Sequence, residues 1–184
     1  MILIPAYNSA SSLKKVLKDL KNYPYLMIVV VDDGSTDNTS EIATSLGAEV
    51  IRHSKNRGKG AALQSGFSFA LEKEVDFIIT QDADEQHPVD SIPEFLALHQ
   101  SHPAAVLLGC RKRSREMPLH RKLSNAISAF LISKRTGRKI YDAQCGFRLI
   151  PKPYYSWQLS KIKGFIYESE ALITLAKNDV KFKY

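Results

Sequence analysis

The sequence has little of several features that mark whole classes of protein. Its two cysteines, Cys110 and Cys145, lie far apart and form no Cys-x-x-Cys pair, which argues against a zinc site or a disulfide framework. The default expectation is therefore a reduced, cytoplasmic compartment. No apolar run approaches the roughly 20 residues that span a bilayer, and no basic segment followed by an apolar stretch opens the chain. We expect neither a membrane span nor a secretion signal in this stretch of chain.

Glycine and proline are not in excess, with 9 and 8 residues of 184. Hydrophobic residues make up 44% and charged residues 24%, which excludes disordered and collagen-like classes. A chain of this length is expected to form one domain with a substantial core. We expect that domain to cover 1–184 and to be incomplete at its C-terminal end, because another strand begins at Phe182 where the sequence stops.

The charge is unbalanced, with 26 Lys and Arg against 19 Asp and Glu, a formal net charge of +7. Such a surface favours anionic partners: nucleic acid, anionic lipid and a diphosphate-bearing substrate all fit, as does a basic surface with no partner. The lysines are scattered, and aromatic residues do not interleave with them to form a stacking surface. We therefore expect no nucleic-acid partner.

Short apolar runs alternate with segments of helical period. The runs at 2–4, 27–31, 48–51, 75–80 and 104–108 predict buried strands, and helices are expected at 11–20, 37–46, 60–71 and 90–99. This alternation predicts an α/β protein with a Rossmann-like, open, mostly parallel sheet and helices on both faces.

A long segment of helical period follows Pro118. Its apolar residues form a stripe that most often faces a core, with contact to a membrane surface as the alternative. The stripe consists of Leu119, Leu123, Ile127, Phe130 and Leu131.

Polar residues follow three of the predicted strands. They form the segments Pro5 to Asn8, Asp32 to Gly34, and Asp82 to Asp84. Ligands of such sheets bind beyond the carboxyl ends of the strands, so these residues are candidates for a site. Clustered carboxylates repel one another, and a divalent cation is the usual remedy.

Asp82 and Asp84 stand two residues apart, so in extended geometry both side chains face the same way. Their oxygens suit Mg²⁺ or Mn²⁺, although solvated loop acids or helix caps would give the same pattern. The turn from Asn56 to Gly60 is basic and flanked by glycine ahead of a helix, which suits either anion binding or helix capping. Its spacing matches neither a P-loop nor a dinucleotide-binding loop.

Five motifs occur together in the order seen in one enzyme family. The sequence resembles the family-2 glycosyltransferases of the GT-A fold, and most closely the branch of dolichol-phosphate mannose synthase and polyprenyl-phosphate glucosyltransferase. The motifs are Ile4-Pro5-Ala6-Tyr7-Asn8, Val30-Val31-Asp32-Asp33-Gly34-Ser35-Thr36-Asp37, Asn56-Arg57-Gly58-Lys59-Gly60, Asp82-Ala83-Asp84 and Gln144-Cys145-Gly146-Phe147-Arg148.

The resemblance implies roles for the motif residues. A nucleotide-sugar donor of the GDP-mannose or UDP-glucose type would be held by Pro5, Ala6, Tyr7, Asp32, Asp33 and Lys59. A Mg²⁺ or Mn²⁺ ion bridging its diphosphate would be held by Asp82, Asp84 and Gln86, and would stabilise the leaving group. Arg148 resembles a family residue near the phosphates, so Asp82, Asp84 and Arg148 are the expected catalytic residues.

The resemblance also implies an acceptor. Arg111 and Arg121 match positions that contact the acceptor phosphate in the polyprenyl-phosphate branch, and an arginine fork suits phosphate. Asn125 stands where the branch often has a serine, and the adjacent Ser124 is the candidate in its place. Basic side chains that are merely solvated, on a loop and a helix, would give the same sequence pattern. The expected partner is thus a polyprenyl or dolichyl phosphate, met by a peripheral protein at the cytoplasmic face of a membrane.

Family members that glycosylate a hydroxyl need a general base, often an acid ahead of a late Gln-x-x-Arg-Trp-like motif. No such motif occurs here, which favours an acceptor that is already anionic. Glu168 and Glu170 resemble a Glu-x-Glu pair of the family, and helix capping would explain them equally well. The alternatives are transfer to a saccharide or protein hydroxyl, a sugar nucleotidyltransferase, and a non-catalytic binding module.

Overall fold

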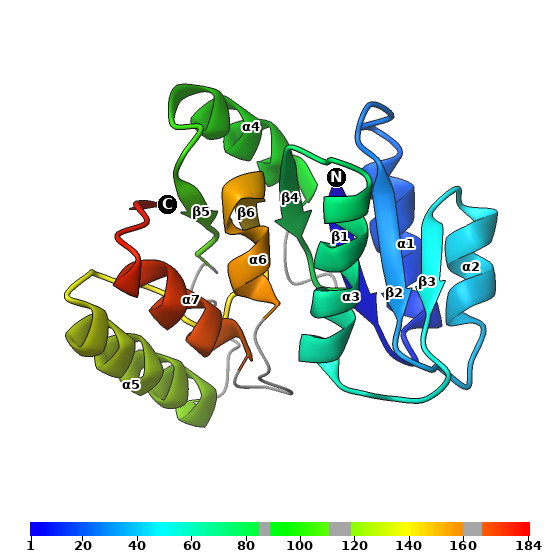
Figure 1. Ribbon diagram of the computed structural model, residues 1–184. Coiled ribbons are helices and arrows are strands. Elements are labelled where there is room, and N and C mark those ends of the chain that lie inside the picture. Colours follow the sequence, from blue (N-terminus) through cyan, green and yellow to red (C-terminus); the bar gives the residue numbers. More distant parts are fainter. Residues whose placement is uncertain (85–88, 111–118, 160–166) are drawn as a thin grey trace.

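The computed structural model describes residues 1–84, 89–110, 119–159 and 167–184, and for residues 119–124 it describes the backbone alone. Within these residues, seven strands form one sheet in the order β3-β2-β1-β4-β6-β5-β7. Figure 1 shows the order of β1 to β6. The strands are β1 (Ile2–Ala6), β2 (Ile28–Asp32), β3 (Glu49–Arg52), β4 (Phe77–Thr80), β5 (Val106–Leu108), β6 (Arg148–Pro151) and β7 (Phe182–Lys183).

The helices connect these strands. They are α1 (Ala10–Leu20), α2 (Thr39–Ser45), α3 (Lys59–Glu72), α4 (Ile92–Ser101), α5 (Leu119–Thr136), α6 (Tyr155–Gln158) and α7 (Tyr167–Lys177). Single 3-10 turns, Val89–Ser91 and Lys152–Tyr154, precede α4 and α6. The predicted strands and helices are confirmed, with ends that shift by a few residues.

The sheet is mostly parallel, as predicted. The pairs β1 with β2, β1 with β4, β2 with β3 and β5 with β7 are parallel. Strand β6 is the exception, because it lies antiparallel between β4 and β5. The sequence did not predict β6: its four residues begin with Arg148, the last residue of the fifth motif, and they end in a proline.

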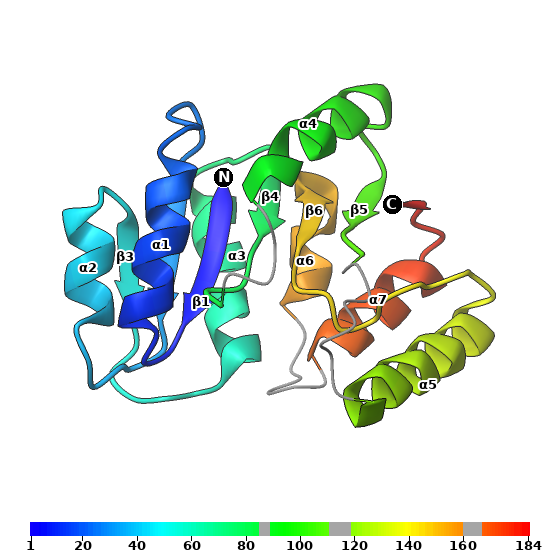
Figure 2. The same ribbon diagram turned by 180° about the vertical axis from the view of Figure 1, so that it is seen from behind.

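Two apolar clusters lie on opposite faces of the sheet. One packs Leu63 and Phe67 of α3 with Tyr155 of α6 and Leu172 of α7. The other packs side chains of α1, α2 and α4 against the opposite face, which Figure 2 shows from behind. Because both faces are covered, the central strands are almost fully buried and are apolar almost throughout.

Helix α5 lies at the edge of the molecule, beside α7 (Figures 1 and 2). The core-facing interpretation of its stripe is wrong for Ile127, Phe130 and Leu131, which are 50%, 66% and 56% exposed. The helix instead buries Ala129 and Ile132. Leu119 and Leu123 belong to the part of α5 whose side chains lie outside the description. Within the described residues, none of the helices is both long enough and apolar enough to cross a membrane.

Candidate active site

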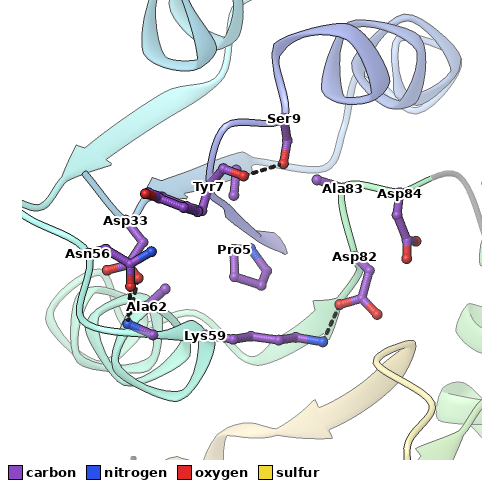
Figure 3. Close-up of a pocket in the computed structure, with 12 residues that line it drawn as sticks. Pro5, Tyr7, Ser9, Asp33, Asn56, Lys59, Ala62, Asp82, Ala83 and Asp84 are labelled. Carbon is purple, nitrogen blue, oxygen red and sulfur yellow. Dashed lines mark hydrogen bonds and ion pairs between the residues drawn. The ribbon is translucent and has the colours of Figure 1, made fainter. Parts of the chain in front are cut away.

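The carboxyl ends of β1 and β4 and the start of α3 surround one cavity of about 400 Å³ (Figure 3). Pro5, Ala6, Tyr7, Asp33, Lys59, Asp82 and Asp84, all expected from the sequence, line it. Ser9, Asn56, Gly58, Ala62 and Ala83 complete the lining. The structure therefore brings the motifs that begin at Ile4, Asn56 and Asp82 to one cavity. Of the motif that begins at Val30, only Asp33 lines it.

Side chains tie together the turns that follow β1 and β2. The Ser35 hydroxyl accepts a hydrogen bond from the Asn8 backbone N–H at 2.9 Å, and the Asn8 side-chain oxygen accepts one from the Thr36 N–H at 2.8 Å. Asp37 accepts hydrogen bonds from the backbone N–H groups of Ala10 and Thr39, each at 3.1 Å, so it joins the first turns of α1 and α2. This network fixes the wall of the cavity that carries Tyr7 and Asp33.

Asp32 and Asp33 are neighbours with different surroundings. Asp32 has no exposed surface and does not line the cavity; its carboxylate accepts hydrogen bonds from the Ser35 N–H at 2.8 Å and from the Ser40 hydroxyl. Burial raises the pKa of Asp32, but these hydrogen bonds and the nearby Arg52 guanidinium outweigh it, so the pKa lies below its usual value. Asp32 thus holds the turn, and its expected contact with a donor stays a prediction.

Asp33 lines the cavity and anchors the loop that carries the basic turn. Its carboxylate accepts hydrogen bonds from the backbone N–H groups of Arg57, at 3.0 Å, and Gly58, at 2.6 Å. His53 Nδ1 lies 2.6 Å from Asp33 Oδ1, and His53 Nε2 lies 2.9 Å from the Ser65 hydroxyl on α3. Sequence reasoning missed His53; the available signal was a polar residue directly after β3.

Lys59 contacts two acids, of which Asp82 lies on the wall of the cavity (Figure 3). Its Nζ lies 2.5 Å from Asp82 Oδ1 and 2.5 Å from Glu168 Oε1 of α7. Burial lowers the pKa of Lys59, and the two negative charges outweigh that effect, so the pKa lies above its usual value. A Cβ at Gly146 would lie closer than 3.0 Å to the Asp82 carboxylate, so any side chain there would force that carboxylate to shift.

Arg148 is almost fully buried and acts on the backbone around it. Its Nε donates to the Cys145 carbonyl at 2.9 Å, Nη2 to the Ala143 carbonyl at 2.9 Å, and Nη1 to the Glu168 carbonyl at 3.0 Å. It lines a pocket of about 10 Å³ next to Lys59 and Asp82, not the 400 Å³ cavity. The arginine thus fixes the start of α7, and its expected catalytic role stays a prediction.

The residues present fit a divalent cation. Asp82 and Asp84 line the same cavity and supply carboxylate oxygens, and a cation on Asp82 would share that carboxylate with the Lys59 ammonium. No three His, Cys, Asp or Glu side chains gather into a metal cluster in the described ranges. A cation here would therefore complete its shell with water or phosphate oxygens. The expected ligand Gln86 lies outside the described residues.

The structure does not describe the side chains of the expected acceptor residues. Arg111 falls outside the described residues, and Arg121 and Ser124 belong to the first turns of α5, where the backbone alone is described. The three remain predictions.

Known proteins resemble this chain over most of its length. The family model "Glycosyl transferase family 2" matches residues 1–156. An uncharacterised protein of Methanocaldococcus jannaschii is 36% identical over 192 residues, which cover 97% of this chain and 82% of the relative. The UDP-N-acetylglucosamine--dolichyl-phosphate N-acetylglucosaminyltransferase of Methanococcus voltae is 32% identical over 200 residues, 96% of this chain and 80% of the relative.

A more distant relative is the undecaprenyl-phosphate 4-deoxy-4-formamido-L-arabinose transferase of Salmonella newport, 29% identical over 163 residues, 83% of this chain and 48% of the relative. Among solved structures, glucosyl-3-phosphoglycerate synthase from Mycobacterium tuberculosis, in complex with Mn²⁺, UDP-glucose and phosphoglyceric acid, superposes with a TM-score of 0.74. The match covers 98% of this chain and 67% of that chain at 18% identity, and it confirms the GT-A fold. The family match, which spans most of the chain, makes this protein a glycosyltransferase of family 2.

Proposed function

We propose that this glycosyltransferase moves a hexose or a hexose-derived sugar from a nucleotide-sugar to a polyprenyl or dolichyl phosphate, with the help of Mg²⁺ or Mn²⁺. The observation that carries the proposal is the single cavity that Tyr7, Asp33, Lys59, Asp82 and Asp84 share. One side of it offers an aromatic ring and hydrogen-bond acceptors, and the other offers charges of both signs.

The first side suits a nucleoside. Tyr7 is 45% exposed and presents a ring at the cavity, on which a base can stack. Asp33 is held by His53 and by two backbone N–H groups, so its carboxylate is rigid and can accept hydrogen bonds from a base or a ribose without a further ordering cost.

The second side suits a diphosphate. Asp82 and Asp84 would hold the cation, which, when bound, neutralises the negative charge that develops on the departing nucleoside diphosphate. Lys59 brings a further positive charge to the same side. The backbone positions of Asp82 and Lys59 are fixed, because Asp82 follows a buried strand and Lys59 opens α3.

The acceptor is proposed from the relatives. The Methanococcus voltae and Salmonella newport enzymes are named as acting on dolichyl phosphate and undecaprenyl phosphate. A lipid phosphate is already deprotonated near neutral pH, so its oxygen can attack the anomeric carbon without a general base. Attack from the side opposite the departing diphosphate inverts the configuration at that carbon.

An acceptor embedded in a bilayer requires the enzyme to reach a membrane surface. Helix α5 offers an exposed apolar face made of Ile127, Phe130 and Leu131, followed by exposed Lys134 and Arg135. Apolar side chains next to basic ones suit the interface of an anionic bilayer. We propose that this α5 surface rests on the membrane and keeps the enzyme peripheral.

The test is a transfer assay with labelled nucleotide-sugars and three acceptors: a polyprenyl phosphate, the corresponding polyprenol, and a free saccharide. The proposal expects a labelled lipid phosphate with inverted configuration and no product from the other two acceptors. Transfer to the saccharide without any lipid, or a product of retained configuration, would contradict it. Release of pyrophosphate from a nucleoside triphosphate and a sugar phosphate would instead indicate a nucleotidyltransferase.

A further inference from the structure

Three elements that are distant in the sequence meet at one ammonium group. Lys59 is the first residue of α3, Asp82 follows β4, and Glu168 lies in the first turn of α7. The Lys59 Nζ lies 2.5 Å from one oxygen of each carboxylate, and the three side chains are 30%, 21% and 13% exposed. Ion pairs this close and this sheltered are far less screened than pairs on the open surface.

Asp82 therefore combines two roles, as a cation ligand and as an ion-pair partner. It is an expected cation ligand, and it is also half of an ion pair. A divalent cation bound to Asp82 would lie within a few ångströms of the Lys59 ammonium, and like charges at that distance repel strongly. The ion pair seen here uses Oδ1 of Asp82, and it opposes a cation on the same carboxylate unless Lys59 moves toward another partner.

Glu168 supplies that partner without a large movement. It already contacts Lys59, so the ammonium loses one of two carboxylates and is not left unpaired. The position of Glu168 is well fixed: Arg148 donates to its backbone carbonyl at 3.0 Å, and the hydroxyl of the preceding Tyr167 donates to the Gln158 carbonyl at 2.7 Å. A flexible lysine between two fixed acids is suited to shift between them.

We propose that Lys59 is a built-in counter-ion of Asp82 that passes to Glu168 when a divalent cation binds. Lys59 and the cation then compete for Asp82, and Glu168 is the positioning residue that receives the ammonium. This inference rests on the proposed cation site. It explains how Asp82 stays neutralised before binding, and it predicts weak cation binding in the absence of nucleotide. Cation and donor would then enter together, because the diphosphate oxygens add the ligands that outweigh Lys59.

The decisive variant replaces both partners, Lys59→Met with Glu168→Gln. It removes one positive and one negative charge, so the net charge around Asp82 is unchanged while the competitor is gone. Titration calorimetry with Mn²⁺ alone, without nucleotide, should give binding at least about tenfold tighter than in the wild-type chain. Lys55→Met is the control, because Lys55 is exposed near the cavity without lining it, and it should change the affinity by less than about twofold.

The role of Glu168 has its own test. With Glu168→Gln alone, Lys59 keeps Asp82 as its partner and loses the second acid, so Mn²⁺ should bind more weakly than in the wild-type chain. Glu170→Gln removes the same charge from the same turn of α7 and is the matched control. A loss of Mn²⁺ affinity that is no larger for Glu168→Gln than for Glu170→Gln would overturn the transfer to Glu168.

A double variant that binds Mn²⁺ no tighter than the wild-type chain, including the case in which neither binds measurably, would overturn the competition. Circular dichroism melting of each variant shows whether it is folded at the titration temperature. Wild-type binding of a nucleoside diphosphate in the presence of Mn²⁺ is measured in parallel. If that binding is present and the double variant shows no gain, the inference fails while the proposed donor site stands; if it is absent, the proposed function fails.

Discussion

His53 and Asp33 form a contact of 2.6 Å between Nδ1 and Oδ1, and Asp33 lines the same cavity as Tyr7. With the backbone N–H groups of Arg57 and Gly58, this contact fixes a carboxylate that we propose binds the donor. His53→Ala leaves the two backbone donors and removes the ring. We expect the affinity for the preferred nucleoside diphosphate to fall about tenfold, as for a lost hydrogen bond to a charged group.

Titration calorimetry measures that affinity, and Ser65→Ala is the matched control. Ser65 contacts the other ring nitrogen of His53 and does not contact Asp33 in the described structure, so its loss should cost less than about threefold. Unchanged affinity in His53→Ala would show that the ring does not position Asp33 for the donor.

Gly34 provides a test of the turn after β2. Its φ is +77°, and a Cβ there would lie 2.5 Å from the backbone carbonyl carbon of Lys55. Because the clash is with backbone, Gly34→Ala should lower the free energy of unfolding by about 3 kcal/mol, or roughly 6–12 °C in Tm. Gly47→Ala is the control: its φ is +88° and nothing lies within 4 Å, so about 1 kcal/mol is expected. Equal losses for the two would contradict the assigned clash.

Asp32 gives the fold a predictable response to acid. Its pKa is lowered in the folded chain, so the stability it contributes is complete above its ordinary pKa of about 4 and is lost as the pH falls through the lower folded value. Urea unfolding between about pH 2.5 and 6 should therefore show a decline toward acid that is shallower in Asp32→Asn. Ser40→Ala should flatten it in part, because it removes one of the hydrogen bonds that lower the pKa. An equally steep decline in Asp32→Asn would rule out this residue as the source.

The α5 surface predicts binding to membranes. Phe130→Ser should reduce binding to vesicles with a high content of anionic lipid by about tenfold, the loss expected for removing one large apolar side chain from the interface. Tyr25→Ser is the control, because Tyr25 is 66% exposed like Phe130 but lies between α1 and β2. Vesicle co-sedimentation at low and high salt measures both variants. Equal effects of the two substitutions would show that α5 is not the surface used.

Much of the site could be predicted, because its residues follow strands. The positions of Asp33, Asp82 and Asp84 follow from the rule that parallel strands end at one edge of a sheet, and the structure places all three at one cavity. Asp32 shares the sequence pattern of Asp33, but it is the last residue of β2, its side chain is fully buried, and it does not line the cavity.

The remaining features depend on contacts between distant segments. His53 is a common polar residue until folding brings it to Asp33. Glu168 resembles one residue of a Glu-x-Glu pair of the family, but its contact with Lys59 arises only in the fold. Strand β6 is too short for periodicity to detect, and it pairs antiparallel. The stripe of α5 has helical spacing, which shows that an apolar face exists but not whether it meets the core or another partner.

The central claim is a metal-dependent donor site at Asp82 and Asp84, and nucleotide binding tests it most directly. GDP, UDP, CDP and ADP are each added with Mn²⁺ or with EDTA to the wild-type chain and to Asp84→Asn, and Tm is measured. One nucleotide with Mn²⁺ should raise the wild-type Tm by about 5–10 °C at a hundredfold excess over its Kd, and the shift should vanish with EDTA and in Asp84→Asn. A wild-type chain with no shift for any nucleotide, or with a shift that survives both EDTA and the substitution, would contradict the account.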